Sequence, residues 1–369
     1  MSTQYVDNFA DDIGPIKILH IYKPKSQLRG IVVVDNLAMG PAAIGGCRMA
    51  PDVSTREVFR LARAMTLKNA VNGLPYGGGK SAIVGDPKSD LKETWMREFA
   101  RAIRDLKEYI PGPDMGTDEQ CMAWVHEEAG RAVGLPYSKG GLPLDELGAT
   151  GFGVAVASDA ASEWMQLPLE NARVVIQGFG NVGRAAATCL LERGVHVIAV
   201  NDSDGGLHNP DGLNIPELFR WVQTRNLNRA THLGEPMERD RVLEIESDIF
   251  VPAARPDVFT EANQHLLKTR LVLEGANIPI THEAARVLHD RGIMVIPDII
   301  ANSGGVICAA AEYEGKTEDQ AFDAIRKSVY RNTTALLKRV RERKQYPHDA
   351  ALQMAREVLS KKMGLYAST

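Results

Sequence analysis

The sequence predicts an α/β protein made of two domains, and three observations support this. The chain of 369 residues is long for a single hydrophobic core. From about Thr150, strand and helix patterns alternate, as in a mostly parallel sheet covered by helices. Within this part the apolar strand Ala172–Gln177 runs directly into a glycine-rich turn. We therefore expect one domain over residues 1–148, completed by about 340–369, and a second over 149–339.

Composition restricts the class of protein. The chain is 44% hydrophobic and 24% charged with a net charge of -4, which gives no indication of a nucleic-acid partner. No apolar run is long enough to cross a membrane, and the first residues do not resemble a secretory signal. The cysteines lack metal-ligand spacing, so we expect no metal site and a reduced, cytoplasmic location. They are Cys47, Cys121, Cys189 and Cys308.

The first domain is expected to combine short strands with amphipathic helices. Ser54 and Glu57 have the spacing of a capping box, which predicts a helix to about Asn72. The other predicted elements are strands over 16–22, 30–35 and 81–84, a glycine-rich connection over 40–51, a helix over about 90–109, and a helix capped by Thr117 and Gln120.

Two lysines mark the first candidate site. Lys68 continues the apolar stripe of its predicted helix, and Lys80 directly follows Gly77–Gly79, interpreted as a glycine-rich turn. Two ammonium groups that share a cleft disfavour each other's charge, so one of them could act as a base near neutral pH. A turn-rich segment farther along presents Asp114.

The second candidate site is a dinucleotide fingerprint. Gly178, Gly180 and Gly183, with Phe179, Asn181 and Val182 between them, form G-x-G-x-x-G between a strand and a helix. Asp202 lies nineteen residues after Gly183, at the end of the next strand. The pattern predicts a Rossmann-type domain, and a carboxylate at this place favours NAD over NADP without excluding NADP.

Further strands are expected over 247–251, 270–273 and 293–296, with a helix beginning near Thr281. The loops VPAA, which contains Ala253, and EGAN, which ends at Asn277, should leave the carboxyl edge of the sheet, where ligands bind. IANSGG supplies Asn302. A long helix from about Thr317 should end near Lys344, followed by a last helix capped by Asp349.

Several blocks together resemble the amino acid dehydrogenases of the glutamate, leucine, phenylalanine and valine dehydrogenase family. They are GGCRM, MTLKNA, LPYGGGKSAIVGDP, PGPDMGT, GATGFG, GFGNVG, EGAN and NSGGV, in this order over roughly residues 30–314. The resemblance implies an α/β oligomerisation and substrate domain beside the Rossmann-type domain, with a cleft between them. It also implies a homo-oligomer, a hexamer or an octamer.

The resemblance implies a role for each matching residue. Lys80 and Asp114 match the catalytic lysine and aspartate, and Lys68 matches the lysine that binds the substrate α-carboxylate. Thr150, Gly178, Gly180, Gly183, Asp202, Asn277 and Asn302 match cofactor contacts, and Asn302 also lies near the substrate. The implied reaction is oxidative deamination: hydride passes from Cα to the nicotinamide, Lys80 activates the water that attacks the imine, and Asp114 shuttles protons, giving a 2-oxo acid and ammonia.

Two positions depart from the glutamate enzymes of that family. Ile44, before Gly45 and Gly46, stands where they have a lysine for the side-chain carboxylate, and Ala309 replaces a serine. Met65 matches the leucine-type enzymes. A substrate side-chain carboxylate beside Ile44 and Ala309 would lack polar partners, so we expect a substrate with a branched-chain or aromatic side chain.

Three alternatives stay open. The first is a glutamate dehydrogenase that uses another basic residue, such as Arg48, for the side chain. The second is a catalytically idle NAD-binding protein, although Lys80 and Asp114 are both present. The third is an enzyme acting on 2-hydroxy acids, which usually requires a histidine that these blocks lack.

Overall fold

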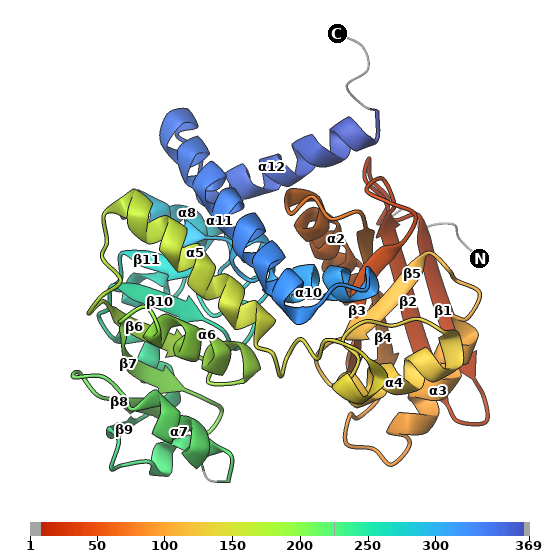
Figure 1. Cartoon of the computed structure of the whole chain (residues 1–369), viewed down its shortest axis with the longest axis horizontal. Coiled ribbons are helices and arrows are strands. Elements are labelled where there is room, and N and C mark those ends of the chain that lie inside the picture. Colours follow the sequence, from red (N-terminus) through yellow and green to blue (C-terminus); the bar gives the residue numbers. More distant parts are fainter. Residues whose placement is uncertain (1–8, 225, 365–369) are drawn as a thin grey trace. The chain divides into compact units, whose positions relative to one another are not determined.

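The chain forms two compact units, seen in a computed structural model that describes residues 9–224 and 226–364. Unit 1 contains the chain up to Leu147, the segment Val306–Phe322 and the chain from Met354 onward. Unit 2 contains Gly148–Gly305 and Asp323–Gln353. Figure 1 labels the elements of both units.

Unit 1 is built on a mixed five-stranded sheet in the order β1-β2-β4-β3-β5. β2 pairs antiparallel with β1 and β4, whereas β3 pairs parallel with β4 and β5. The strands are β1 (Lys17–Lys23), β2 (Leu28–Asn36), β3 (Ala43–Ala50), β4 (Gly77–Val84) and β5 (Tyr109–Pro113).

Helices cover both faces of this sheet, because the side chains of β2 alternate between two apolar clusters. Val32 and Val34 pack with α3 (Lys92–Ala102) and α4 (Glu119–Ala129). Ile31 and Val33 pack with α2 (Thr55–Val71). β2 and β4, between their neighbours, are therefore buried on both faces.

Two glycine-rich segments that we expected to be a connection and a turn are strands. The segment 40–51 contains the whole of β3, and Gly77–Gly79 open β4. The reason is close packing: a Cβ added to Gly45 would lie 1.6 Å from the carbonyl oxygen of Gly79. Glycine here allows neighbouring backbones to approach, which local sequence patterns do not distinguish from a turn.

Two predicted helices differ from the observed ones at their boundaries. The helix expected over 90–109 ends at Ala102, and β5 occupies Tyr109–Pro113. The N-cap of α4 is Asp118, whose side chain accepts from the Cys121 N–H, rather than Thr117. The capping role of Ser54 at α2 is confirmed, since its hydroxyl accepts from the Glu57 N–H.

Unit 2 contains a seven-stranded sheet in the order β12-β11-β10-β6-β7-β8-β9. The first five are parallel, and β8 and β9 extend the edge in antiparallel fashion. The hairpin of β8 and β9 was not predicted. The strands are β6 (Arg173–Gln177), β7 (His196–Asn201), β8 (Gly206–His208), β9 (Glu235–Met237), β10 (Ile249–Pro252), β11 (Leu271–Leu273) and β12 (Met294–Ile296).

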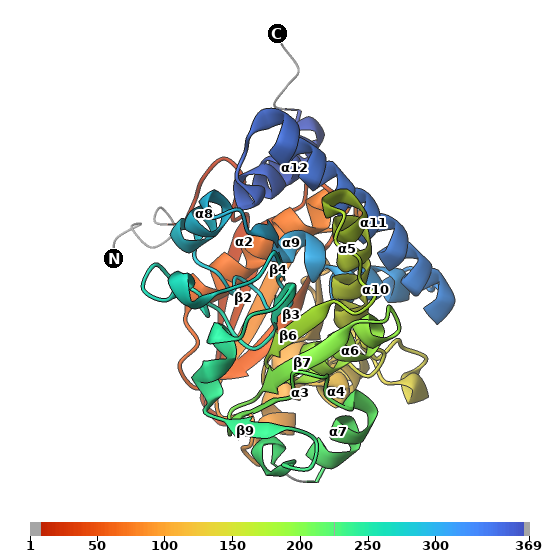
Figure 2. The same cartoon turned by 90° about the vertical axis from the view of Figure 1, so that its left-hand side faces the viewer.

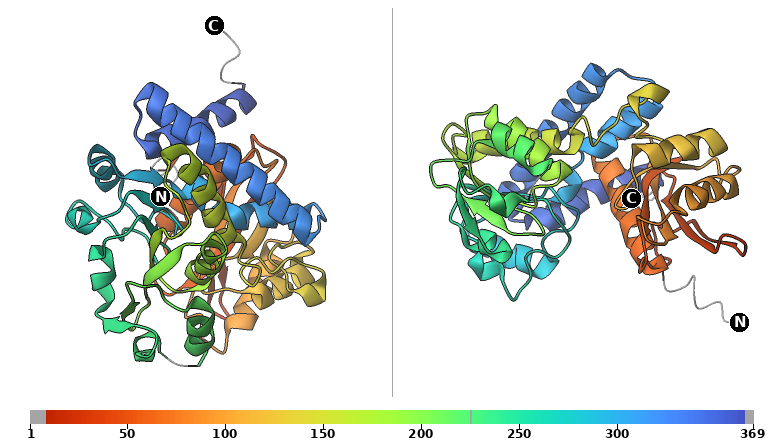
Figure 3. Two further views of the ribbon diagram at one scale, coloured as in Figure 1. Left: turned by 60° about the vertical axis from the view of Figure 1, so that its left-hand side comes forward. Right: turned by 90° about the horizontal axis from the view of Figure 1, so that it is seen from below.

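The helices of unit 2 give the sheet its doubly wound form. α5 (Ala149–Met165) and α6 (Asn181–Leu191) lie on one side of the sheet and α8 (His282–Asp290) on the other (Figures 2 and 3). The N-cap of α8 is Thr281, as predicted. Unit 2 also contains α7 (Ile215–Val222) and α9 (Asp298–Ala301). From Val306 onward α10 (Gly304–Tyr313) belongs to unit 1, and α11 (Glu318–Arg343) and α12 (Pro347–Lys362) have residues in each unit.

Asp349 lies in the first turn of α12 and not at its cap, because Pro347 is already helical. Its carboxylate instead pairs with His282 and Arg286 of α8. Among residues 9–224 and 226–364, no helix has the length and apolar character needed to cross a membrane.

Candidate active site

Lys80 and Asp114 form the centre of the candidate site in unit 1. Lys80 lies in the middle of β4, and Asp114 directly follows β5, two strands that flank β3. The ammonium of Lys80 donates to Oδ1 of Asp114 at 2.6 Å. Both side chains are largely buried, with 5% and 13% of their surfaces exposed. Gly46 of β3 allows this approach, because a Cβ there would lie 2.7 Å from the Asp114 Cβ.

Arg48 is a partner of Asp114 that the motif comparison did not assign. Its Nε donates to Oδ2 of Asp114 at 2.8 Å, and its NH1 donates to Glu57 at 2.6 Å. Thr117 fixes the backbone of the same residue, since its hydroxyl accepts from the Asp114 N–H and donates to the Cys47 carbonyl. The aspartate is therefore held by two cations and one hydroxyl.

The electrostatics of the site follow from this arrangement. Burial by itself would raise the pKa of Asp114, but the charges of Lys80 and Arg48 outweigh burial and lower the pKa below its ordinary value. Burial raises the pKa of the neighbouring Cys47 thiol to about 12, so this cysteine is a neutral packing group. Asp114 is an anion at neutral pH.

Lys68 and Met65 lie on α2, which packs directly against β4. Lys68 is buried, with 6% of its surface exposed, and Met65 is half-buried one turn earlier. Lys68 thus belongs to the helix that packs against the strand of Lys80.

Ile44 and Ala309 belong to one apolar cluster of unit 1. Ile44 of β3 is 2% exposed, and Ala309 of α10 is 5% exposed. The buried members of this cluster are Ile44, Tyr76, Ile110, Val133, Ala309 and Ala310. Arg48, considered above for a substrate carboxylate, is instead engaged by Asp114 and Glu57.

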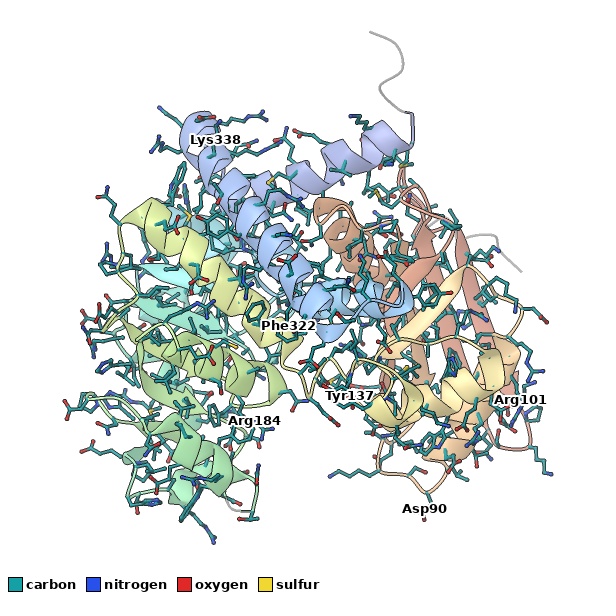
Figure 4. All side chains as sticks on the ribbon, in the orientation of Figure 1. Asp90, Arg101, Tyr137, Arg184, Phe322 and Lys338 are labelled. Carbon is teal, nitrogen blue, oxygen red and sulfur yellow. The ribbon has the colours of Figure 1, made fainter. Side chains whose placement is uncertain are left out.

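The dinucleotide fingerprint of unit 2 has the geometry expected of it. Gly178 has φ of +99°, and a Cβ on Gly183 would lie 1.9 Å from the Gly178 carbonyl oxygen. A Cβ on Gly180 would meet nothing within 4 Å, and within the described chain no side chain caps α6 there. Arg184, labelled in Figure 4, donates to the Gly180 carbonyl at 3.3 Å.

The remaining fingerprint residues surround this turn. Phe179 is buried, and its N–H donates to the Asn201 carbonyl at 2.7 Å. Asn181 is exposed and Val182 half-buried in the first turn of α6. Asp202, half-buried after β7, accepts from the Asp204 N–H. Its carboxylate therefore caps a local turn of its own loop.

Asn201 is a residue of this site that motif reasoning passed over. It is buried at the end of β7, and its Oδ1 accepts from the Gly178 N–H at 2.7 Å. Its side-chain amide donates to the Arg239 carbonyl at 2.8 Å. The side chain thus fixes the first glycine of the turn, a role detectable only once β6 and β7 are known to be neighbours.

Two further loops meet the fingerprint at the carboxyl edge of the sheet. The Ala253 N–H donates to the Gln177 carbonyl at 2.7 Å, where the strand order reverses between β6 and β10. Asn302 donates from its amide to the carbonyl of Ala276 at 3.0 Å and to Oδ1 of Asn277 at 3.2 Å. Thr150 lies half-buried in the first turn of α5, beside the close approach of Gly304 to Ala149.

These residues fit a dinucleotide. The open space above Gly180 and the uncapped N-terminus of α6 suit a pyrophosphate, which such N–H groups and the helix dipole bind. Asp202 would accept ribose hydroxyls, and the family resemblance implies that Asn277 and Asn302 meet the nicotinamide end.

Comparisons with known proteins identify the family. The description "Glu/Leu/Phe/Val dehydrogenase, dimerisation domain" matches residues 20–131, and "Glutamate/Leucine/Phenylalanine/Valine dehydrogenase" matches residues 140–365. The chain belongs to the Glu/Leu/Phe/Val dehydrogenase family. It is thus an amino acid dehydrogenase acting on a CH–NH2 group, and the predicted two-domain α/β fold with a Rossmann-type domain is confirmed.

Glutamate dehydrogenases are among the relatives of this chain. The one from Aeropyrum pernix is 35% identical over 356 residues, covering 89% of this chain and 84% of the relative. The NAD-specific glutamate dehydrogenase of Staphylococcus aureus (strain COL) is 38% identical over 322 residues, covering 81% and 77%.

Solved structures agree on the fold. The hetero-hexameric glutamate dehydrogenase from Thermus thermophilus in its Leu bound form has a TM-score of 0.85 at 28% identity, covering 96% of this chain and 91% of that one. The L-tryptophan dehydrogenase from Nostoc punctiforme has a TM-score of 0.72 at 24% identity, covering 96% and 98%, and this likeness concerns the fold alone.

Proposed function

We propose that this chain catalyses the reversible NAD-dependent oxidative deamination of an L-amino acid. The names of its relatives favour L-glutamate as the substrate. The observation behind the reaction is the buried Lys80–Asp114 pair, joined at 2.6 Å, in a family of amino acid dehydrogenases. NAD is supported by the NAD-specific relatives and by the carboxylate of Asp202.

The proposed roles follow from charge and position. Lys68 pairs with the α-carboxylate of the substrate and fixes its orientation. NAD, when bound, supplies the hydride acceptor. Lys80, in its uncharged amine form, holds the water that attacks the substrate imine and accepts the proton that this water loses. Asp114, anionic and held by Arg48, passes protons to the departing amine, so that a 2-oxo acid and ammonia leave.

A second candidate substrate is an L-amino acid with an apolar branched or aromatic side chain. The specific observation is that Ile44 and Ala309, at the two positions that depart from the glutamate enzymes, are buried together in one apolar cluster. Leaving a substrate carboxylate unpaired in an apolar environment costs several kcal/mol. The relatives' names favour glutamate, and this cluster favours the alternative.

One assay separates the two candidates. NADH oxidation is measured with ammonia and each of five 2-oxo acids: 2-oxoglutarate, 4-methyl-2-oxopentanoate, 3-methyl-2-oxobutanoate, phenylpyruvate and indolepyruvate. Preference for 2-oxoglutarate supports glutamate, and preference for the others supports the apolar substrate. Absence of turnover with all five would contradict the proposed reaction.

We further propose that the chain assembles into a homo-oligomer. Support comes from residues 20–131, which match a domain described as a dimerisation domain, and from a structural relative described as a hetero-hexamer. Light scattering on the purified chain gives the number of subunits directly. A monomeric mass would contradict this proposal.

A further inference from the structure

Unit 2 contains a buried ion pair that no role above includes. Glu274 directly follows β11 and is 0% exposed, and His348 is the second residue of α12. Nε2 of His348 lies 2.9 Å from Oε1 of Glu274. The other ring nitrogen of His348 is buried without a partner among the described residues, so Nε2 makes the polar contact of the ring.

Glu274 also begins a chain of bonds that encloses the loop after β11. Its Oε2 accepts from the Asp298 N–H at 2.8 Å, and Oδ2 of Asp298 accepts from the Ile278 N–H at 2.9 Å. Ile278 has φ of +50°, a conformation that is unfavourable for a β-branched side chain. Such a residue persists only where surrounding bonds fix it, and Asp298 supplies one of them.

The enclosed residues are those expected to meet the cofactor. Between Glu274 and Ile278 lie Gly275, Ala276 and Asn277, and the amide of Asn302 donates to the carbonyls of Gly275 (3.2 Å) and Ala276 (3.0 Å). The N–H groups of Gly275 and Ala276 donate to the Pro252 carbonyl. Displacement of Glu274 would therefore move the side of the loop that carries Asn277.

We propose that His348 and Glu274 act together as positioning residues that hold the loop Glu274–Ile278 in the conformation that binds the dinucleotide. This inference rests on the proposed use of NAD. Neither residue is proposed to touch the reacting atoms. The expected consequence is on cofactor affinity, with turnover at saturating cofactor largely preserved.

The charges around His348 make this role dependent on pH. Glu274, Asp298 and Asp349 face the imidazole, and Asp349 is itself paired with His282 and Arg286 of α8. Burial would lower the pKa of His348, but the carboxylate of Glu274 outweighs burial and raises it. The stabilisation that the pair of His348 and Glu274 gives is fully present at pH below the pKa of His348 in the unfolded chain. It is lost as pH rises through the raised pKa of His348 in the folded state. NADH affinity should therefore fall toward alkaline pH.

The test compares NADH binding by fluorescence titration in the full chain and three variants. Glu274→Gln and His348→Leu should each weaken NADH binding by about tenfold, the scale on which loss of a positioning partner acts. Asp349→Asn is the matched control, because it breaks an ion pair in the same turn of α12 and leaves the contact of His348 with Glu274 in place; at acidic pH, where His348 keeps its proton, its NADH affinity should be unchanged. Deuterium exchange of residues 274–278 should rise in the first two variants alone.

A conservative variant and the pH profile separate positioning from folding. His348→Gln retains a donor near Glu274, so it should recover part of the affinity while its binding no longer varies toward alkaline pH. Equal NADH affinity and equal exchange in all variants would overturn this inference while leaving the proposed function intact. Absence of NADH binding by the unmodified chain would overturn the proposed function, and this inference with it.

Discussion

Replacement of Arg48 by glutamine tests how the charge of Asp114 is maintained. The substitution removes the bond from Nε to Oδ2 at 2.8 Å and leaves the carboxylate with Lys80 as its remaining cationic partner. A hydrogen bond to a charged group contributes about 1.5–3 kcal/mol. If the bond acts fully in the transition state, its loss lowers kcat by about tenfold to hundredfold.

The direction in which pH affects stability and activity follows from the lowered pKa of Asp114. Because the pKa of Asp114 is lowered by Lys80 and Arg48, its ion pairs stabilise the fold above the unfolded pKa, and this stabilisation is lost as pH falls through the folded one. Arg48→Gln should raise the pKa of Asp114. The acidic limb of the kcat/KM profile for deamination should move to higher pH, and acid unfolding should begin at higher pH.

Glu57→Gln provides the control. Glu57 is the other partner of Arg48, but its side chain is 40% exposed, so its loss costs at most about 1 kcal/mol. Its pH–rate profile should match that of the unmodified chain. An unchanged acidic limb in Arg48→Gln, with kcat within a factor of about two, would refute the reasoning that Arg48 maintains the charge of Asp114.

Three further substitutions test other parts of the account. Ile44→Lys should raise the ratio of kcat/KM for 2-oxoglutarate to kcat/KM for 4-methyl-2-oxopentanoate by about tenfold or more, and should lower the free energy of unfolding by about 2–5 kcal/mol. An unchanged ratio would show that Ile44 does not determine substrate specificity. Asn201→Ala should weaken NADH binding by about tenfold in a fluorescence titration, because the Gly178 N–H loses its acceptor, and unaltered binding would show that the turn holds without it. Arg131→Met should lower the free energy of unfolding in urea by about 3–5 kcal/mol, because the guanidinium donates to five backbone carbonyls, and a loss under 1 kcal/mol would contradict this role.

Local patterns predicted those parts of the fold whose cause is local. The strand, glycine turn and helix around Gly178–Gly183 form as expected, because the apolar run, the turn and the helix start are adjacent in sequence. The helix start at Ser54 follows for the same reason. The glycines of β3 and β4 were misinterpreted, because their cause is the approach of another strand, visible only in the folded sheet.

The contacts within the candidate site likewise separate into those that sequence motifs predicted and those that depend on the fold. Motif matching found Lys80 and Asp114, but not Arg48, which lies 66 residues from Asp114 in the chain. His348 and Glu274 are 74 residues apart, and no pattern near either indicates the pair. Contacts of this kind depend on which elements pack together, so they emerge from the structure and not from spacing.

The most direct test of the central claim is turnover and NADH binding by Lys80→Ala, measured on the same preparation. Deamination should fall to background, because the buried partner of Asp114 and the proposed base are lost together, while NADH should bind with an affinity within about twofold of the unmodified chain. Near-normal turnover by Lys80→Ala would contradict the assignment of Lys80 and Asp114 as the reacting centre.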